Sequence, residues 1–423
     1  MFEPVRNAIK IPELRRKILY TLAVLVLFRI GSYVPVPGVD SAALARQLGV
    51  DRGNIFGFLD LFAGGALSRF SVFAMGVSPY ITSSIILQLL TIVIPQLEEL
   101  AKEGGVEGRR KIANYTRYGA VVLGLIQAFG ITMLARNYNV LATGSTFDMV
   151  LIVVTLVAGT TLLMWMGEKI SEQGIGNGIS LIIFVGIVAS MPFELVQAIQ
   201  GVIQGVISPL SLIVFLLLAV LVVAGVVMIQ QGQRRIPVQY AKRVVGRRMY
   251  GGQSTHIPLS VNQAGVIPVI FASSVLAFPL TLAQFIPALE GLSRVVGYGT
   301  VVYNILYALL TMFFTYFYTA VTFDPREVAD NMKKWGGFVP GLRPGRPTAQ
   351  YLDRILTRIT LVGAVFLAVM AVLPYIMAGI TRMPPGMLYF GGTSVLIAVG
   401  VALDTVKQIE AHLLMRHYEG FLK

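Results

Sequence analysis

The chain has 423 residues, of which 55% are hydrophobic and 13% charged, and its formal net charge is +13. Soluble domains carry about 25% charged residues, so this composition excludes an ordinary soluble surface and predicts a multi-pass membrane protein. Cysteine is absent, which excludes disulfides, thiolate metal sites and cysteine nucleophiles. The three histidines form no metal-binding pair, so we expect no metal, no cofactor and no enzyme activity.

The N-terminal segment MFEPVRNAIKIPELRRKIL places basic residues ahead of an apolar run. Pro35, Val36, Pro37 and Gly38 follow this run where a removable signal peptide would carry a small-residue cleavage site. We therefore expect a cytosolic tail followed by a first membrane span that is retained in the mature protein.

Ten apolar runs follow one another along the chain, and a transmembrane helix needs roughly 20 such residues. The runs lie at Ile18–Val34, Phe70–Ile94, Tyr115–Ala135, Met149–Met166, Asn177–Ser190, Pro209–Ile229, Ala264–Phe285, Val301–Phe323, Ile359–Met377 and Gly391–Val406. The segment Asn54–Phe73 is too short, and too broken by Gly64 and Gly65, to span. We expect it to re-enter from the outside as a half-helix, although an interfacial amphipathic helix would give the same pattern.

Basic residues are distributed asymmetrically around these runs. If the N-terminus is cytosolic, most of the 34 Lys and Arg residues fall in cytosolic tails and loops, so the positive-inside rule predicts that both termini are cytoplasmic. The spans form two sets of five, at 1–190 and 209–423, joined by an external connection at 191–208. Halves with an odd number of spans are inverted, which places the working site between them near the midplane.

Arg29 and Asp404 are the ionisable residues that lie well inside apolar runs. A charge at the centre of a span costs about 2.5–3.5 kcal/mol, and a structural role is the plainer interpretation for both residues. A secondary active transporter of small solutes, the main alternative function, would place several titratable groups near the midplane. A membrane-bound enzyme would need a cluster of nucleophile, base or metal ligands, which the chain lacks.

Two long cytosolic loops, at about 231–263 and 324–358, interrupt the C-terminal half. The first holds six basic residues and no acidic residue, and its alternating IPVQY segment favours a β-hairpin. The second carries a Gly/Pro-rich tip around Arg343. Such loops suit the docking of ribosomal RNA or an acidic protein surface, whereas a solvated positive-inside face is the alternative.

Long motifs throughout the chain resemble the SecY family, the channel subunits of the bacterial Sec protein translocon. They include LFAGGALSRFSVFAMGVSPYITSSIILQLL, QRRIPVQYAKRVVGRRMYGGQSTHIPL and FDPREVADNMKKWGGFVPGLRPGRPTAQYLDRI. The resemblance implies an all-α membrane protein whose ten transmembrane helices form two inverted five-helix halves with a re-entrant plug half-helix. It also implies a protein-conducting channel that translocates unfolded secretory polypeptides and releases transmembrane segments laterally into lipid.

The resemblance further implies four sets of site residues. An apolar pore ring falls on Val77, Ile81, Ile179, Ile183, Ile270 and Ile397. A plug at about 58–70 includes Phe58, Leu59, Leu61, Phe62, Gly64, Gly65, Leu67 and Arg69. A lateral gate, between the second and third spans and the seventh and eighth, includes Thr82, Gln127, Ser273, Ser274 and Phe278. The arginines implied in partner docking are Arg247, Arg248 and Arg343. Ordinary apolar packing remains the alternative role for the ring residues, and interhelical hydrogen bonding for the polar gate residues.

The implied partners are SecE, SecG, the SecA ATPase, the ribosome through its rRNA and proteins, the nascent or preprotein chain with its signal sequence, and the lipid bilayer. The implied location is the bacterial cytoplasmic (inner) membrane. No Walker A motif is present, so we expect a partner to supply the energy.

Overall fold

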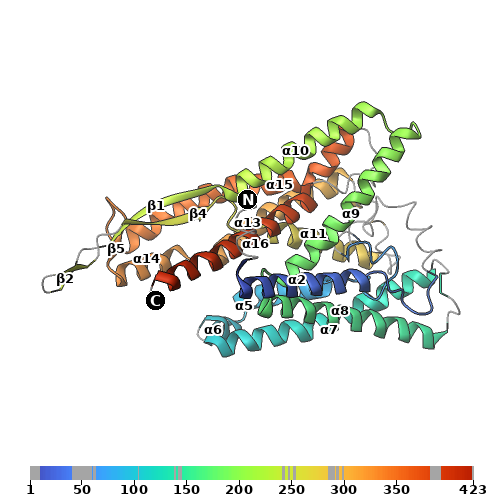
Figure 1. The fold of residues 1–423 in the computed structure, drawn as a ribbon, viewed down its shortest axis with the longest axis horizontal. Coiled ribbons are helices and arrows are strands. Elements are labelled where there is room, and N and C mark those ends of the chain that lie inside the picture. The colour runs from blue at the N-terminus through green and yellow to red at the C-terminus, as the bar shows by residue number, and fades with distance from the viewer. Residues whose placement is uncertain are drawn as a thin grey trace.

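The computed structural model describes residues 10–40, 60, 63–102, 104–137, 140–141, 145–240, 243–245, 248–250, 254–283, 291, 295–297, 300–381 and 392–421. Within these ranges the chain is mostly helical, and long helices run side by side in a bundle (Figure 1). Several helices begin at a polar cap whose side chain accepts a hydrogen bond from a first-turn N–H, namely Ser145, Asn177, Thr300 and Asp324.

The N-terminal half contributes helices that form the lower, blue-to-green part of the bundle in Figure 1. They are α2 (Pro12–Gly31), α5 (Ser78–Val93), α6 (Pro95–Lys102), α7 (Gly105–Asn137), α8 (Thr146–Gln173) and α9 (Gly178–Ile203). Helix α9 leads from this lower part towards the upper part, where it meets α10 (Figure 1).

The C-terminal half forms the upper, yellow-green to red part of the bundle. Its helices are α10 (Pro209–Gln231), α11 (Ile267–Ala283), α13 (Val301–Thr322), α14 (Pro325–Lys334), α15 (Arg346–Thr381) and α16 (Gly392–Phe421). Helix α2 begins, and α16 ends, on the side of the bundle that carries the strands and α14 (Figure 1).

Among the described residues, six helical stretches are long and apolar enough to cross a membrane: α8, α9, α10, the stretch Val301–Lys334 that holds α13 and α14, α15, and α16. A seventh results if α5 and α6, which meet at a bend of 103°, count as one span. Each of the ten predicted apolar runs contains a helix. That all ten cross the membrane stays a prediction.

Several helices differ from the boundaries that the sequence predicts, and the differences at α5 and α9 have a clear physical reason. Helix α5 begins only at Ser78, because residues 64–77 form turns and a single bridge, and Phe70 adopts a φ of 46° that ends regular structure. Helix α9 continues through Pro192 to Ile203, into the segment predicted as an external connection. Proline removes one helical hydrogen bond, but a strongly apolar sequence in a membrane helix tolerates that loss.

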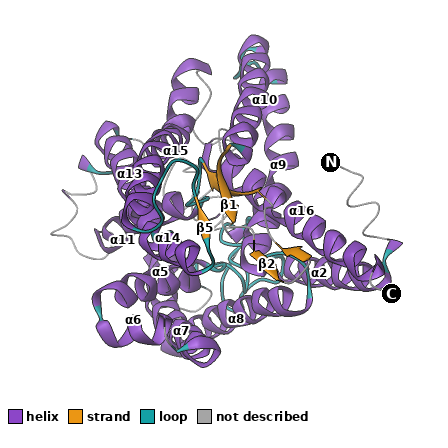
Figure 2. Cartoon of the chain, turned by 90° about the vertical axis from the view of Figure 1, so that its left-hand side faces the viewer, coloured by secondary structure: helices purple, strands orange, loops and turns teal. Residues whose placement is uncertain are grey.

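The two long loops, predicted to be cytosolic, form one small β-structure, so the all-α expectation needs correction. Strand β1 (Gln233–Tyr240) pairs antiparallel with β4 (Ser254–Ser260), which confirms the predicted hairpin. Strand β1 also pairs with β5 (Gly337–Phe338) of the second loop, giving the order β4-β1-β5. A separate two-stranded sheet joins β2 (Arg243–Val245) to β3 (Arg248–Tyr250). Figure 2 views the molecule from this end, with the strands in front of the helices.

Alternation along β1 explains why the two loops hold together. Ile236 and Val238 are buried on one face of the strand, while their neighbours are exposed. We call the apolar core that they enter the loop cluster; its buried members are Ile236, Val238, Leu259, Met332, Val339 and Leu352. Because this cluster draws on β1, β4, α14 and α15, the two loops fold as one unit.

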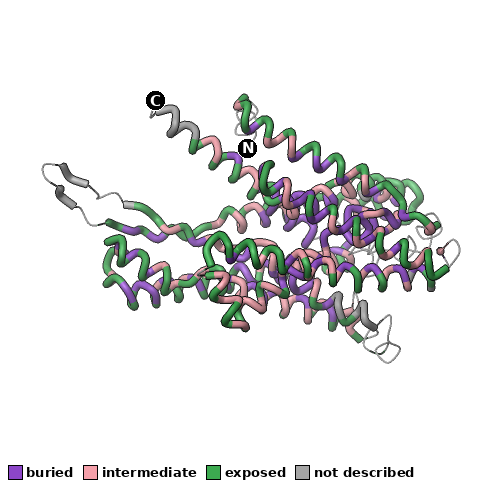
Figure 3. Tube along the Cα trace, turned by 90° about the horizontal axis from the view of Figure 1, so that it is seen from below, coloured by how far each residue is buried: buried purple, intermediate pink, exposed green. Residues whose placement is uncertain are grey.

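Two larger apolar clusters fill the bundle, and buried positions concentrate along the middle of the molecule (Figure 3). The first, the central cluster, includes Phe28, Leu67, Phe70, Val77, Ile152, Leu156, Ile183 and Ile397. The second, the gate cluster, includes Ile85, Val269, Phe271, Ala272, Leu276, Phe314 and Leu396. The central cluster draws mainly on the N-terminal half and the gate cluster mainly on the C-terminal half, and α16 contributes to both.

Candidate functional site

All six side chains predicted for the pore ring lie at the central cluster. Val77, Ile183 and Ile397 are buried members, each at most 3% exposed. Ile81, Ile179 and Ile270 are partly buried and pack against the same cluster. These residues come from α5 and its N-cap, from α9, from α11 and from α16, so both halves of the chain contribute to one apolar junction.

The side chains at this junction are chemically suited to excluding water. Aliphatic side chains offer water no hydrogen-bond partner, and a narrow apolar constriction therefore stays free of water and ions. Among the described residues, no group of three or more His, Asp or Glu side chains could hold a metal ion.

The described part of the predicted plug packs against the same junction. Ala63, Ala66 and Leu67 are buried members of the central cluster. Residues 64–70 form successive turns where a half-helix is predicted, and Gly64 and Gly65 adopt φ values of 66° and 80°, which favour glycine. The predicted plug residues Phe58, Leu59, Leu61 and Phe62 lie outside the described residues.

Asp60 organises these turns, and the sequence did not single it out. One carboxylate oxygen, Oδ1, accepts hydrogen bonds from the backbone N–H groups of Leu67, at 2.8 Å, and Ser68, at 3.0 Å. An Asp four residues ahead of a Gly-Gly break is the signal that could have suggested this capping role.

The predicted lateral gate contains a thin, apolar contact between α5 and α11. Ile85 of α5 belongs to the gate cluster together with Val269, Ala272 and Leu276 of α11. The polar candidates do not bond across the contact. The Thr82 hydroxyl donates to the Ser78 carbonyl at 3.0 Å, and the Ser273 hydroxyl donates to the Ile270 carbonyl at 2.8 Å, each within its own helix.

The other gate candidates add little to this contact. Gln127 and Ser274 are half-buried on α7 and α11. Phe278 lies in the helical backbone of α11, and its side chain is outside the described part of the structure.

Helix α5 is tied to α7 by polar contacts that the sequence did not suggest. The Ser83 hydroxyl, which is 2% exposed, donates to the Thr116 carbonyl at 2.8 Å. Farther along, Arg117 Nε of α7 donates to Glu168 of α8 at 2.8 Å. The three helices α5, α7 and α8 therefore form one body, whereas the contact with α11 depends on apolar packing that can part without leaving buried polar groups unsatisfied.

The predicted docking arginines lie in the sequence of the two long loops. Arg343 is exposed next to Gly341, whose φ is 83°, and its carbonyl accepts a hydrogen bond from the Thr348 hydroxyl at 2.8 Å, which fixes the tip to the first turn of α15. The backbone of Arg248 lies in β3. Arg247 lies outside the described residues.

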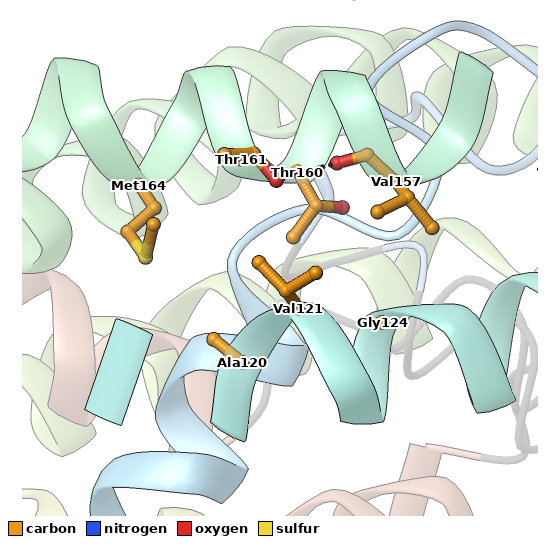
Figure 4. Close-up of a pocket in the computed structure, with 7 residues that line it drawn as sticks. All are labelled: Ala120, Val121, Gly124, Val157, Thr160, Thr161 and Met164. Carbon is orange, nitrogen blue, oxygen red and sulfur yellow. Dashed lines mark hydrogen bonds between the residues drawn. The ribbon is translucent and has the colours of Figure 1, made fainter. Parts of the chain in front are cut away.

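A small groove lies between α7 and α8 in the described structure (Figure 4). Its lining includes Val121, Gly124, Val157 and Met164, and it has no room for a water molecule. The Thr161 hydroxyl donates a hydrogen bond to the Val157 carbonyl at 2.8 Å. The groove offers too little space for a cofactor.

Sequence comparisons identify relatives over the full length of the chain. The sequence model of the SecY family matches residues 71–406. A Thermotoga maritima protein named protein translocase subunit SecY is 49% identical over an alignment that covers 100% of this chain and 98% of the relative. The Escherichia coli K12 protein of the same name is 48% identical, with 97% of this chain and 94% of the relative covered.

Solved structures share the fold. One described as "The structure of a protein conducting channel" matches with a TM-score of 0.64 at 20% identity and covers 96% of both chains. Sec61 in the canine ribosome-channel complex gives a TM-score of 0.63 at 20% identity, again with 96% of both chains covered. A SecY structure whose plug domain is described as stabilising the closed state of the channel gives 0.62 at 18% identity and the same coverage.

Proposed function

This chain belongs to the SecY family, and from that membership and the geometry of its central cluster we propose how it conducts polypeptides. The protein is a protein-conducting translocation channel. Unfolded secretory chains pass across the membrane through it, and apolar segments leave it sideways into lipid. The observation that carries this conclusion is the convergence of six aliphatic residues and the plug turns at one junction between the two halves.

The closed channel is sealed by this junction. The six ring residues form a narrow constriction that excludes water, and the turns at 63–70 block it from the outside. The ring consists of Val77, Ile81, Ile179, Ile183, Ile270 and Ile397. A translocating chain displaces the plug and replaces the ring's mutual contacts with its own. Because the ring is aliphatic, it adapts to any side chain without specific polar recognition.

The lateral gate opens where α5 meets α11. The hydrogen bond from α5 to α7 and the ion pair from α7 to α8 hold these three helices together as one body. Separation therefore occurs at the apolar contact between α5 and α11. An apolar segment inside the pore then exchanges protein contacts for lipid contacts at little cost in free energy.

We assign ten spans in two inverted halves, with both termini in the cytoplasm of a bacterial cell and the channel in its inner membrane. Support comes from the basic loops and from the start of α2 and the end of α16, which lie on the same side of the bundle. SecE and SecG are the proposed membrane partners. The SecA ATPase or a ribosome supplies the driving force, and the channel itself catalyses no reaction.

The alternative of a small-solute transporter is not supported. Relatives aligned over the whole chain are translocase subunits, and the central cluster consists of apolar side chains where coupling would require titratable ones.

Reconstitution tests the proposed function directly. The chain, assembled with SecE and SecG in proteoliposomes, should protect a radiolabelled preprotein from external protease when SecA and ATP are added. Omitting ATP is the matched control. Absence of ATP-dependent protection, in vesicles where all the subunits are inserted, would contradict the channel function.

A further inference from the structure

Arg29 has no role in conduction as described so far. It lies in the last turn of α2, the end expected to face outwards. A charged side chain in a span is unfavourable, and a cation near the outer end opposes the positive-inside rule. Its ordinary behaviour there would be to extend its guanidinium group towards the outer surface.

The guanidinium group of Arg29 turns instead to the plug segment. Its Nη1 donates to the Gly64 carbonyl at 2.7 Å, a hydrogen bond that joins α2 to the plug turns. Its Nη2 donates to the Tyr33 hydroxyl at 3.2 Å, and its Cζ lies 5.1 Å from the centroid of the Tyr33 ring. Tyr33 thus orients the guanidinium group so that one N–H points at the plug.

Gly64 is also the point at which the plug touches α9. A Cβ added to Gly64 would lie 2.8 Å from the Cα of Gly186, and the φ of Gly64 is positive at 66°. No other residue fits both conditions without strain. The carbonyl that Arg29 holds therefore belongs to the residue pressed against the helix that supplies Ile179 and Ile183 of the ring.

Arg69 provides a natural comparison within the plug. Its Cζ lies 4.1 Å from the same Tyr33 ring, but its Nη1 is buried without a hydrogen-bond partner among the described residues. Its stacking on the ring is favourable, as is its attraction to Asp60, while the unsatisfied donor is unfavourable.

We propose that Arg29 is a positioning residue that latches the plug shut through its hydrogen bond to the Gly64 carbonyl. This inference rests on the proposed function, in which the turns at 63–70 seal the pore. The latch joins a backbone carbonyl to a side chain of α2, so displacing the plug breaks one charged hydrogen bond while leaving the fold of α2 intact.

The test measures plug opening without requiring transport. Leu67, which is 4% exposed, becomes the single cysteine of the chain through Leu67→Cys, and its alkylation by N-ethylmaleimide is timed in proteoliposomes. Burial limits the reaction to open conformers, so its rate reports how often the plug opens. Adding Arg29→Met should raise the rate about tenfold or more, since a hydrogen bond to a charged donor is lost.

Arg136→Met is the matched control, because it removes an exposed arginine from the last turn of another helix, α7, without breaking a bond to the plug backbone. We expect it to change the rate less than about threefold. Arg29→Lys keeps the charge but loses the forked donor geometry, so it should raise the rate by a smaller factor than Arg29→Met.

An unchanged rate in Arg29→Met, or an equal increase in Arg136→Met, would overturn the latch. If Arg29→Met does not insert, an unchanged rate in Arg29→Lys overturns it equally. ATP-dependent translocation is measured in the same Leu67→Cys vesicles. Its absence counts against the channel function, whereas the alkylation rates still decide the latch.

Discussion

Six aliphatic side chains meet at the centre of the molecule, where we propose that they seal the channel. Val77, Ile183 and Ile397 are almost fully buried, and each exposes only carbon atoms to the junction. A hydroxyl at any of these positions would give water a partner inside the constriction, which lowers the free-energy cost of filling it. The ring therefore depends on side-chain polarity more than on side-chain shape.

Changing Ile81, Ile183 and Ile397 together to Ser, with residues 58–70 deleted, should make the resting channel conduct ions. Single-channel recordings or ion flux from vesicles measures the leak. The matched control replaces the same three residues with Val, which removes one methylene at each position for about 0.5–1.5 kcal/mol of stability but keeps the ring apolar. Equal tightness in the Ser and Val variants would argue strongly against the ring.

At this scale the sequence predicted part of the site. The i, i+4 spacing of Val77 with Ile81, and of Ile179 with Ile183, places each pair on one helix face. It does not show that four helices bring these faces together. For Arg29 the sequence predicts a structural role but not the partner, because that partner is a backbone carbonyl 35 residues away and any residue type would carry one.

Among the elements, the contrast between two neighbouring contacts of α5 decides how the gate can move. On one side Ser83 bonds to the backbone of α7, and on the other Ile85 packs among apolar side chains of α11. Separating α5 from α7 would leave the buried Ser83 hydroxyl unsatisfied, at about 1–3 kcal/mol. Separating α5 from α11 into lipid carries no such penalty.

Two engineered disulfides test this contrast in the cysteine-free chain. Thr82 lies four residues inside α5 and Phe278 five residues from the end of α11, so both sit about 6–8 Å along their helices. Oxidising Thr82→Cys with Phe278→Cys should stop translocation, and reduction should restore it. Translocation is followed by protease protection of a preprotein before and after reduction.

The control disulfide joins the two helices that we expect to move together. A Cβ at Gly119 of α7 would lie 3.5 Å from the Cβ of Ser83, which is within disulfide range. Ser83→Cys with Gly119→Cys should therefore cross-link and leave transport unchanged. Efficient cross-linking of the first pair with undiminished transport would rule out gating between α5 and α11.

The boundaries of helices and strands were predicted least well where tertiary packing outweighs the local preference of the sequence. Pro192 ended the predicted fifth span, but α9 continues for another eleven residues because its apolar surface outweighs one lost hydrogen bond. The hairpin of β1 and β4 was predicted from alternation. Its pairing with β5 was not, since a strand of two residues, Gly337 and Phe338, carries no periodicity of its own.

At the scale of the whole molecule, the main feature is that the two long loops fold together. Their shared loop cluster, with Val238 and Leu352 among its buried members, makes a single unit from segments that lie about 100 residues apart. Helix α15 begins in this unit at Arg346 and continues to Thr381 inside the bundle. A partner that docks on the unit therefore acts directly on a helix that packs against α11 and α13.

Docking on this unit should depend on arginine geometry as well as on charge. Arg343 is exposed on a tip fixed by the Thr348 hydroxyl, and a guanidinium group can engage phosphate or carboxylate through two parallel bonds, which an ammonium group cannot. Arg343→Lys, and Arg247→Lys with Arg248→Lys, should insert normally but weaken ribosome or SecA binding about five- to tenfold. Binding to vesicles across a salt series measures the affinity, and contacts to RNA phosphates that are lost should also flatten its salt dependence.

Arg326→Lys, on an exposed position of α14 in the same unit, should leave both affinity and salt dependence unchanged. If the docking variants behave like Arg326→Lys, these arginines serve only to orient the chain in the membrane, since lysine meets that need equally well.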